Sequence, residues 1–375
     1  MRLAISWSIN ETFLLGAASD PAMRGAAPEE LFLDCLPVPK GIMAAARRRD
    51  HDVRALIGNS IVENSCSQRL QTSWMRRLRR LRPLPRLDAS LWQSWRDRWL
   101  LRWRPDVYIY CGTVPSRRTA ARLKQVGTLL VQYTGIYPAP LPPHDVVRRG
   151  LSAADVAVCN SEGIARQAAE LGCPRAHFVY SAYEDSHFRN LEMTPWSARP
   201  YDVGFVGEIG SLHGARRAFL AEVFERCADL KLSLHTNTSE LPGALGRLAK
   251  PAGGPRDLPR LLSLSRISLN VQADGAEHDT RGVNFRTFEI PAAGCLQVMT
   301  YQGGIEDIFV PDEDVVCVTS PEEAERRIRA LLASPREAEA VAARACAKVA
   351  SHTWARRGDQ ILEICEAEAR RRRSE

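Results

Sequence analysis

The sequence predicts an α/β protein of two Rossmann-like, doubly wound domains that face each other across a cleft. Short apolar runs alternate with helical patterns, which is typical of parallel strands covered by helices. The pattern runs to about residue 190, stops at a polar, proline-containing stretch over 190–200, and then restarts. A chain of 375 residues also has room for two cores of roughly 150–200 residues each. Tandem domains of this kind leave a cleft between the carboxyl ends of their strands, where ligands bind.

The N-terminal domain is expected to span residues 1–192. Its strands are short apolar runs next to turn residues, expected at 2–8, 52–57, 107–112, 128–133, 155–160 and 177–181. Its helices follow helical apolar spacing and are expected at 40–49, 117–125 and 161–171, the last capped by Ser161. The stretch 137–144 contains four prolines, so an extended loop is expected there.

The C-terminal domain is expected to span residues 200–352. Its strands are expected at 201–207, 231–235, 267–271, 295–299 and 314–319. Its helices are expected at 216–227, 257–264, 321–332 and 336–349. Residues 353–375 are expected to form a C-terminal helix that crosses back to the N-terminal domain and ends in a basic tail.

Composition excludes several classes of protein. The chain is 45% hydrophobic and 25% charged, as globular proteins are, and it lacks the run of about 18 apolar residues that a transmembrane helix needs. Asn10 and Glu11 interrupt the apolar N-terminus, which favours a first strand over a signal peptide. Ten cysteines occur without a C-x-x-C pair, which favours free thiols over disulfides or zinc ligands. A cytoplasmic protein is therefore expected.

The net charge of +7 is concentrated in a basic insert at residues 69–104, which holds eleven arginines and five tryptophans. Over 91–103 the tryptophans follow helical spacing, with Arg96, Asp97 and Arg98 off that face. Three interpretations stay open. The tryptophans pack on the N-terminal sheet while the arginines meet solvent, or the helix lies on an anionic membrane surface at the inner face. Nucleic-acid binding uses the same charges, but no recognised motif accompanies them.

The stretch 281–300, RGVNFRTFEIPAAGCLQVMT, carries the strongest functional signal. Polar and charged residues precede a small-residue turn and then an apolar strand. Arg286 and Glu289 lie three residues apart and share one helix face. A cation and a carboxylate at a helix start above a buried strand can hold phosphates and sugar hydroxyls together. The alternative is a surface ion pair on an ordinary αβ unit.

Four stretches resemble GT-B glycosyltransferases, and most closely the CgeB-like (spore maturation protein) group. Residues 202–207 (DVGFVG) look like the opening strand of the nucleotide-binding half, and 257–270 (DLPRLLSLSRISLN) resemble the unit before the active-site loop. Residues 284–294 (NFRTFEIPAAG) match the R-x-F-E box followed by small residues and glycine. Residues 351–362 (SHTWARRGDQIL) resemble the closing H-T-x-x-R helix. The resemblance covers about residues 200–365.

The resemblance implies metal-independent transfer of a sugar from a UDP-, GDP- or dTDP-sugar, with no permanently bound cofactor. The acceptor would be a hydroxyl of a glycan, a lipid-linked acceptor or a small molecule. By position, Glu289 would accept hydrogen bonds from the donor ribose and Arg286 would meet the diphosphate, whose developing charge arginines stabilise. The other implied donor-site residues are Gly207, Glu208, His213, Arg216, Arg281 and Asn284.

Two questions stay open at this point. Many retaining members carry a second glutamate eight positions before the first, where this chain has Arg281, so the stereochemical outcome is undecided. An inverting enzyme would need a base in the N-terminal half, for which the candidates are Glu11, Asp34, His144 and Asp145. A nucleotide-sugar epimerase or hydrolase of the same fold, or a non-catalytic relative that binds an envelope component, are the alternative functions.

Overall fold

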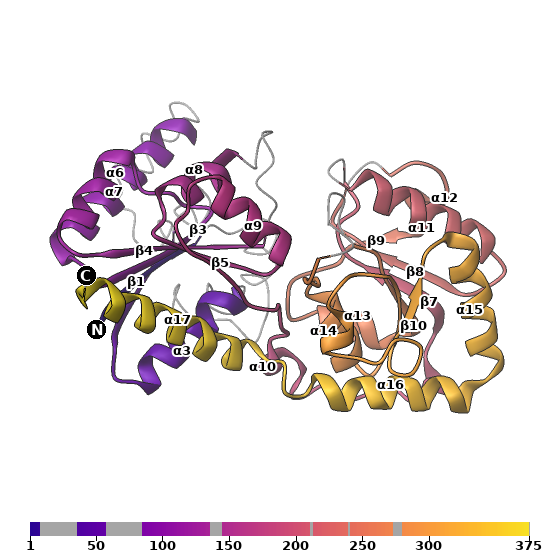
Figure 1. The fold of residues 1–375 in the computed structure, drawn as a ribbon. Coiled ribbons are helices and arrows are strands. Elements are labelled where there is room, and N and C mark those ends of the chain that lie inside the picture. The colour runs from indigo at the N-terminus through magenta and orange to yellow at the C-terminus, as the bar shows by residue number, and fades with distance from the viewer. Residues whose placement is uncertain are drawn as a thin grey trace. The chain divides into compact units, whose positions relative to one another are not determined.

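A computed structural model describes residues 1–7, 36–57, 85–135, 145–210, 213–238, 241–272 and 280–374. The chain divides into two compact units, each with a parallel six-stranded sheet (Figure 1). Unit 1 comprises Met1–Val179 together with Arg357–Glu375, and unit 2 comprises Tyr180–Arg356. The predicted α/β class with two doubly wound sheets is confirmed. The proline-rich stretch 137–144, predicted as a loop, lies outside the described residues.

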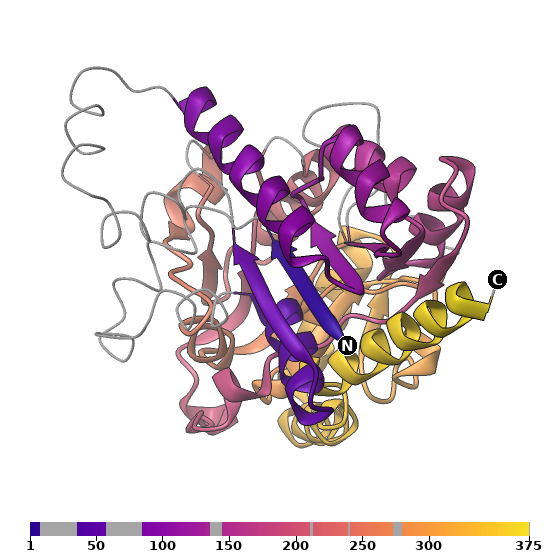
Figure 2. The same cartoon turned by 90° about the vertical axis from the view of Figure 1, so that its left-hand side faces the viewer.

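The sheet of unit 1 has the strand order β2-β1-β3-β4-β5-β6. Its strands are β1 (Arg2–Trp7), β2 (Asp52–Ile57), β3 (Val107–Cys111), β4 (Leu129–Thr134), β5 (Val156–Cys159) and β6 (Ala176–Phe178). Its helices are α3 (Pro37–Arg48), α6 (Pro85–Trp103), α7 (Arg117–Gln125), α8 (Asp145–Ala153), α9 (Glu162–Glu170) and the C-terminal α17 (Trp354–Ser374). Helices α6 to α9 cover one face of the sheet, and α3 and α17 cover the other (Figures 1 and 2). Burial of both faces explains why these strands are apolar throughout.

Serine caps fix the starts of two helices in unit 1. The hydroxyl oxygen of Ser161 accepts a hydrogen bond from the backbone N–H of Gly163 at 3.2 Å, which confirms the predicted cap. Ser116 caps α7 in the same way, because its hydroxyl oxygen accepts from the N–H of Thr119 at 3.2 Å. Each cap satisfies a backbone donor that the first helical turn leaves without a partner.

The sheet of unit 2 has the order β12-β11-β10-β7-β8-β9. Its strands are β7 (Tyr201–Val206), β8 (Leu232–His235), β9 (Ala249–Lys250), β10 (Ser265–Asn270), β11 (Leu296–Thr300) and β12 (Val316–Val318). Numbered within the unit and read from the β9 edge, this is the order 3-2-1-4-5-6 of dinucleotide-binding folds. The direction of winding reverses between β7 and β10. That point, where such sheets bind their ligands, is the switch point of unit 2.

The helices of unit 2 are α10 (Asp185–Phe188), α11 (Gly214–Arg226), α12 (Gly243–Leu248), α13 (Leu258–Ser263), α14 (Arg286–Ala292), α15 (Pro321–Ala333) and α16 (Pro335–Val349), with 3₁₀ turns at Trp196–Ala198 and Ile305–Asp307. The stretch expected to link the domains, 190–200, lies within unit 2. There the Trp196 side chain is buried in the core of the unit. The Arg199 guanidinium donates to the carbonyl oxygens of Thr194, Ser265 and Gly294 at 2.8–3.0 Å.

The predicted face of helix α6 is right for Trp99 and Trp103, which pack against the core of unit 1, and wrong for Trp95, Arg96 and Asp97. Arg96 and Asp97, expected away from the sheet, are 3% and 7% exposed, whereas Trp95 is 49% exposed. The buried guanidinium of Arg96 donates to Asp97 at 3.1 Å and to the carbonyl oxygen of Val114 at 2.8 Å. The Asp97 carboxylate in turn accepts from the backbone N–H of Ser116 at 3.2 Å. The pair is buried because it satisfies backbone groups in the loop after β3. Residues 69–84 of the basic insert lie outside the described residues.

Five of the eight cysteines in the described ranges are buried and three are partly buried. The eight cysteines within the described residues are free, as predicted. Burial raises the pKa of Cys111, Cys295 and Cys365 to about 12, so these thiols stay protonated at neutral pH. Among the helices that the described residues form, none is both long and apolar enough to cross a membrane.

Helix α17 returns the chain to unit 1, as predicted, and two features hold it there. A Cβ atom on Gly358 would lie 2.2 Å from the carbonyl oxygen of Gly41 in α3, so a larger residue at position 358 would push the two helices apart. Further along the helix, the buried carboxylate of Glu368 accepts hydrogen bonds from Arg175 at 3.2 Å, His177 at 3.1 Å and Arg371 at 3.0 Å. Burial opposes ionisation of Glu368, but these three donors outweigh it and hold its pKa below the ordinary value.

We expect Glu368→Gln to lower the free energy of unfolding at pH 7 by about 2 kcal/mol, because hydrogen bonds to a charged group are worth about 1.5–3 kcal/mol. The pKa of Glu368 is depressed in the folded state, so its contribution is present above its ordinary pKa of 4.5 and is lost as pH falls through the folded-state value. Urea denaturation at pH 7 and pH 3.5 measures the difference, which should shrink in acid. Glu363→Gln is the control, because that carboxylate is 64% exposed and, among the described residues, forms its ion pair with Arg49. Equal effects of the two variants would contradict the assignment.

Candidate functional site

Arg286 lies at the switch point of unit 2 and joins helix α14 to the central strand. Its Nε donates to the carbonyl oxygen of Val206, the last residue of β7, at 2.8 Å. Its Nη1 forms an ion pair with Oε2 of Glu289, one turn further along α14. The two side chains are 27% and 12% exposed, so the pair is half-buried and still reaches the surface. The prediction that Arg286 and Glu289 share one helix face is confirmed, and their role toward a donor stays a prediction.

A network of amides fixes the start of α14. The side-chain oxygen of Asn284 accepts from the backbone N–H of Thr287 at 3.1 Å, which is the bond of a helix cap. Its Nδ2 donates to Oδ1 of Asn270, at the end of β10, at 2.7 Å. Asn270 is buried and its own amide donates to Thr287 Oγ1 at 3.1 Å. Asn284 therefore positions α14, and with it Arg286, against β10. Its predicted contact with the donor stays a prediction.

Arg216, in the first turn of α11, bridges the loops that follow the two strands at the switch point. Its Nη1 donates to the carbonyl oxygen of Glu208, after β7, at 2.9 Å. Its Nε donates to the carbonyl oxygens of Val271 and Gln272, after β10, at 3.0 and 3.4 Å. The guanidinium thus lies where the switch point leaves backbone carbonyls at the ends of both strands.

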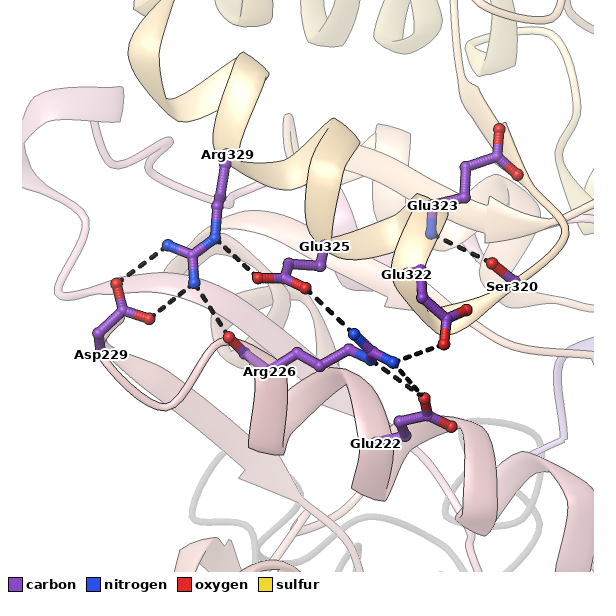
Figure 3. A network of polar contacts seen from close by, with 8 residues as sticks. All are labelled: Glu222, Arg226, Asp229, Ser320, Glu322, Glu323, Glu325 and Arg329. Atoms are coloured by element: carbon purple, nitrogen blue, oxygen red, sulfur yellow. Dashed lines mark hydrogen bonds and ion pairs between the residues drawn. The ribbon is translucent and has the colours of Figure 1, made fainter.

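A network of charged residues holds α11 against α15 (Figure 3). Arg226 of α11 donates to Glu222 at 2.9 Å and to Glu322 of α15 at 2.5 Å. Arg329 of α15 donates to Glu325 at 3.0 Å and binds Asp229 through two bonds of 2.9 and 3.0 Å. Charges of alternating sign on two helices reinforce one another more than isolated surface pairs do. The network steadies the helix whose first turn carries Arg216.

The other residues predicted after β7 are also brought together. The N–H of Gly207 donates to the carbonyl oxygen of His235 at 3.0 Å. The carboxylate of Glu208 accepts from the hydroxyl of Thr238, beyond β8, at 2.9 Å. His213 precedes α11, and its backbone N–H donates to Gly210 at 2.9 Å. The loops after β7 and β8 and the start of α11 therefore meet at one edge of the sheet.

Arg281 belongs to a separate cluster beside the loop that follows β11. Its Nε and Nη2 bind the Asp307 carboxylate at 2.7 and 2.6 Å, and its guanidinium lies 5.7 Å from the centre of the Tyr180 ring. The Tyr180 hydroxyl donates to the same carboxylate at 2.6 Å. Hydrogen bonds from Tyr180 and Arg281 lower the pKa of Asp307. A carboxylate thus already offsets the charge of Arg281, whose place in the donor site stays a prediction.

Two residues that flank the central strand were not predicted. His235 ends β8 and Gln272 follows β10, and each is 7% exposed. Within the described residues, Nε2 of each side chain is buried and has no hydrogen-bond partner. Nδ1 of His235 lies 3.2 Å from the carbonyl oxygen of Pro251, which requires the proton on Nδ1 and leaves Nε2 as an acceptor. Burial lowers the pKa of His235, so the ring is neutral at pH 7. The sequence signal that could have identified His235 and Gln272 is their position at the ends of predicted strands.

The candidate bases in the N-terminal half stay predictions. Glu11, Asp34 and His144 lie outside the described residues. Asp145 is the first residue of α8, but its side chain is not among the described ones. No group of three or more histidine, cysteine, aspartate or glutamate side chains in the described ranges is arranged to hold a metal ion.

Comparisons with known proteins bear on the fold and on the family. Residues 216–363 match a family model described as glycosyl transferase-like. A search of curated proteins gives no match. The structure is similar to HepE of Anabaena in complex with UDP, with 13% identity over 98% of this chain and 100% of that chain and a TM-score of 0.62.

Two further solved structures are similar along the whole chain. A glycosyltransferase from Rickettsia africae ESF-5 is 11% identical over 98% of both chains, with a TM-score of 0.61. Sucrose-phosphate synthase from Thermosynechococcus elongatus is 12% identical over 97% of this chain and 98% of that chain, with a TM-score of 0.59. At these identities the likeness shows the fold, which is the GT-B fold of glycosyltransferases. The finer resemblance to the CgeB-like group stays a prediction.

We expect Asn284→Ala to lower the free energy of unfolding by about 2 kcal/mol, because it leaves the buried Oδ1 of Asn270 without its donor and removes the side-chain bond to the Thr287 N–H. Urea denaturation followed by circular dichroism measures the change. Asn190→Ala is the control: Asn190 is exposed, so its replacement should change stability by less than about 0.5 kcal/mol. A stable Asn284→Ala protein would show that the amide network does not hold α14.

Proposed function

We propose that this protein transfers a sugar from a nucleotide-diphosphate sugar to an acceptor hydroxyl without a metal ion, with the donor bound at the switch point of unit 2. The observation that carries the proposal is the placement of Arg286, whose guanidinium joins the end of the central strand to the carboxylate of Glu289. The family match over residues 216–363 and the GT-B fold support glycosyl transfer in general. The CgeB-like resemblance of 284–294 supports these two residues as its donor-binding pair.

The chemistry assigns a role to each part of the site. The bond between the anomeric carbon and the diphosphate oxygen breaks, and a bond from the acceptor oxygen to the anomeric carbon forms. The acceptor proton passes to a base, and the nucleoside diphosphate leaves with increased negative charge. Arg286 and Arg216 supply positive charge there from side chains that backbone carbonyls already hold in place, so little reorganisation is needed as the charge develops. Glu289 accepts hydrogen bonds from the donor ribose.

The unpartnered polar groups of His235 and Gln272 support a ligand at the same place. They lie on the strands on either side of β7, which at about 4.8 Å per strand separates them by roughly 10 Å. Buried polar groups without partners are uncommon and destabilising. A nucleotide offers donors and acceptors over that span. HepE has been solved with UDP and with UDP-glucose, which makes UDP the first nucleotide to test.

The first prediction concerns the donor class. One nucleoside diphosphate from a panel of UDP, GDP, dTDP and ADP should raise the melting temperature most, because a ligand that binds only the folded state stabilises it by mass action. Its sugar derivative should then release nucleoside diphosphate only when an acceptor is added, at an unchanged rate in EDTA. Conversion of the sugar without an acceptor would instead indicate an epimerase or hydrolase. Binding without turnover across a broad acceptor panel would indicate a non-catalytic relative.

The second prediction concerns the pair at the switch point. Glu289→Ala should weaken nucleotide-sugar binding or turnover at least about tenfold, equivalent to about 1.4 kcal/mol. Arg286→Lys should also lower turnover, because an ammonium cannot hold the Val206 carbonyl and Glu289 in one planar fork. Calorimetric titration and steady-state kinetics measure both effects. Glu339→Ala, an exposed glutamate on α16, is the matched control. Near-normal kinetics of a folded Glu289→Ala protein would refute its role.

A further inference from the structure

One surface of unit 1 is basic and carries two exposed hydrophobic side chains. On α6, positions 95, 98 and 102 follow helical spacing and all three side chains are exposed. Helix α7 packs beside α6 and exposes Arg117, Arg118 and Arg122. Trp95 is 49% exposed and Val126, at the end of α7, is 47% exposed. The α6–α7 surface is defined here as Trp95, Arg98, Arg102, Arg117, Arg118, Arg122 and Val126.

Over residues 93–126, whose side chains the structure describes, the positive charge of this surface has no exposed acidic counterpart on α6 or α7. Residues 93–126 contain eight basic side chains and two acidic ones. One of the acids, Asp97, is buried against Arg96, and the other, Asp106, accepts the backbone N–H of Arg2 at 2.7 Å. Within the described residues, Arg102, Arg118 and Arg122 form no ion pair. By contrast, Lys124 at the end of α7 pairs with Asp155 at 2.9 Å.

The burial of Arg96 and Asp97 explains why a tryptophan faces outward. The buried pair and Leu100 occupy the inward side of α6, where they satisfy the loop after β3. Trp95 is thereby placed on the outward side with Arg98 and Arg102. An exposed indole is more stable at the headgroup level of a lipid bilayer than in water. Arginines beside it can bind the lipid phosphates. An exposed aromatic ring within an arginine-rich surface is the pattern of a helix that lies in that interface.

We propose that the α6–α7 surface binds reversibly to anionic phospholipid headgroups. Each basic residue near such a surface contributes enough for about a fivefold change in affinity, so several arginines together give measurable attachment without a membrane-spanning helix. The proposal does not depend on sugar transfer, because none of its residues lies in unit 2. It assigns the membrane as the partner that fits the charge and the exposed indole together.

The test is sedimentation of the full-length protein with vesicles of phosphatidylglycerol and phosphatidylcholine in equal parts, compared with phosphatidylcholine alone. The patch variant carries Arg102→Gln, Arg118→Gln and Arg122→Gln, and should bind the anionic vesicles about 100-fold more weakly than the unmodified chain. The control variant carries Arg247→Gln, Arg326→Gln and Arg336→Gln, three exposed arginines of unit 2. Both variants lose the same charge, so the control should keep its vesicle binding. Circular dichroism and melting temperature confirm that both fold.

Further outcomes separate the alternatives. Trp95→Ala should weaken vesicle binding at high salt as well as at low salt, because the indole contributes through apolar contact and not through charge. Equal loss of binding in the patch and control variants would overturn the proposal, as it would reflect net charge alone. Absence of binding to anionic vesicles would also overturn it. Tight binding of an oligonucleotide that the patch variant loses, together with no vesicle binding, would assign the surface to nucleic acid instead.

Discussion

A backbone carbonyl at the end of a parallel strand needs a hydrogen-bond donor once the ladder stops, and in unit 2 arginines supply it. Arg286 donates to Val206 at the end of β7, and Arg216 donates to the carbonyls that follow β7 and β10. Both guanidiniums are consequently fixed before any ligand arrives. Since a planar guanidinium has five donors, each can hold the backbone and still present N–H groups elsewhere. The same bonds that close the sheet edge therefore place positive charge at the switch point.

The amides of Asn284 and Asn270 connect the start of α14 to β10. Asn284 caps the helix and Asn270 anchors the cap to β10, so the position of Arg286 depends on β10 as well as on β7. Away from the site, the Arg199 guanidinium also binds backbone carbonyls. It donates to three of them, two of which lie at or before the amino ends of β10 and β11. Arg199, Arg216 and Arg286 thus each hold backbone carbonyls in place, and Arg286 also reaches the surface at the switch point.

Local signals in the sequence were sufficient to predict the bounds of elements that turn residues or a capping side chain enclose. Residues 52–57 and 117–125 were predicted with the bounds that the structure has, because turn residues and a serine cap enclose them. The face of α6 could not be predicted from periodicity, since Arg96 and Asp97 are buried by bonds to the distant loop at 114–116. Helix α12 and strand β9 escaped prediction because glycines at 243 and 246 weaken the helical signal and β9 has two residues. The ion pair of Arg281 with Asp307 could not be predicted, because the two residues lie 26 positions apart and nothing local reveals their contact.

The route of the chain also bears on how the protein is made. Unit 2 is a single continuous segment, whereas unit 1 consists of an early part and α17, which is synthesised after unit 2. The surface of unit 1 that receives α17, including Gly41 and His177, must therefore wait for the last stretch to leave the ribosome. All residues of unit 2 have been synthesised by then, so unit 2 can complete its fold before unit 1, although it comes second along the chain. The N-terminal half would accordingly keep the apolar surface that α17 covers exposed for longer than unit 2 keeps its own.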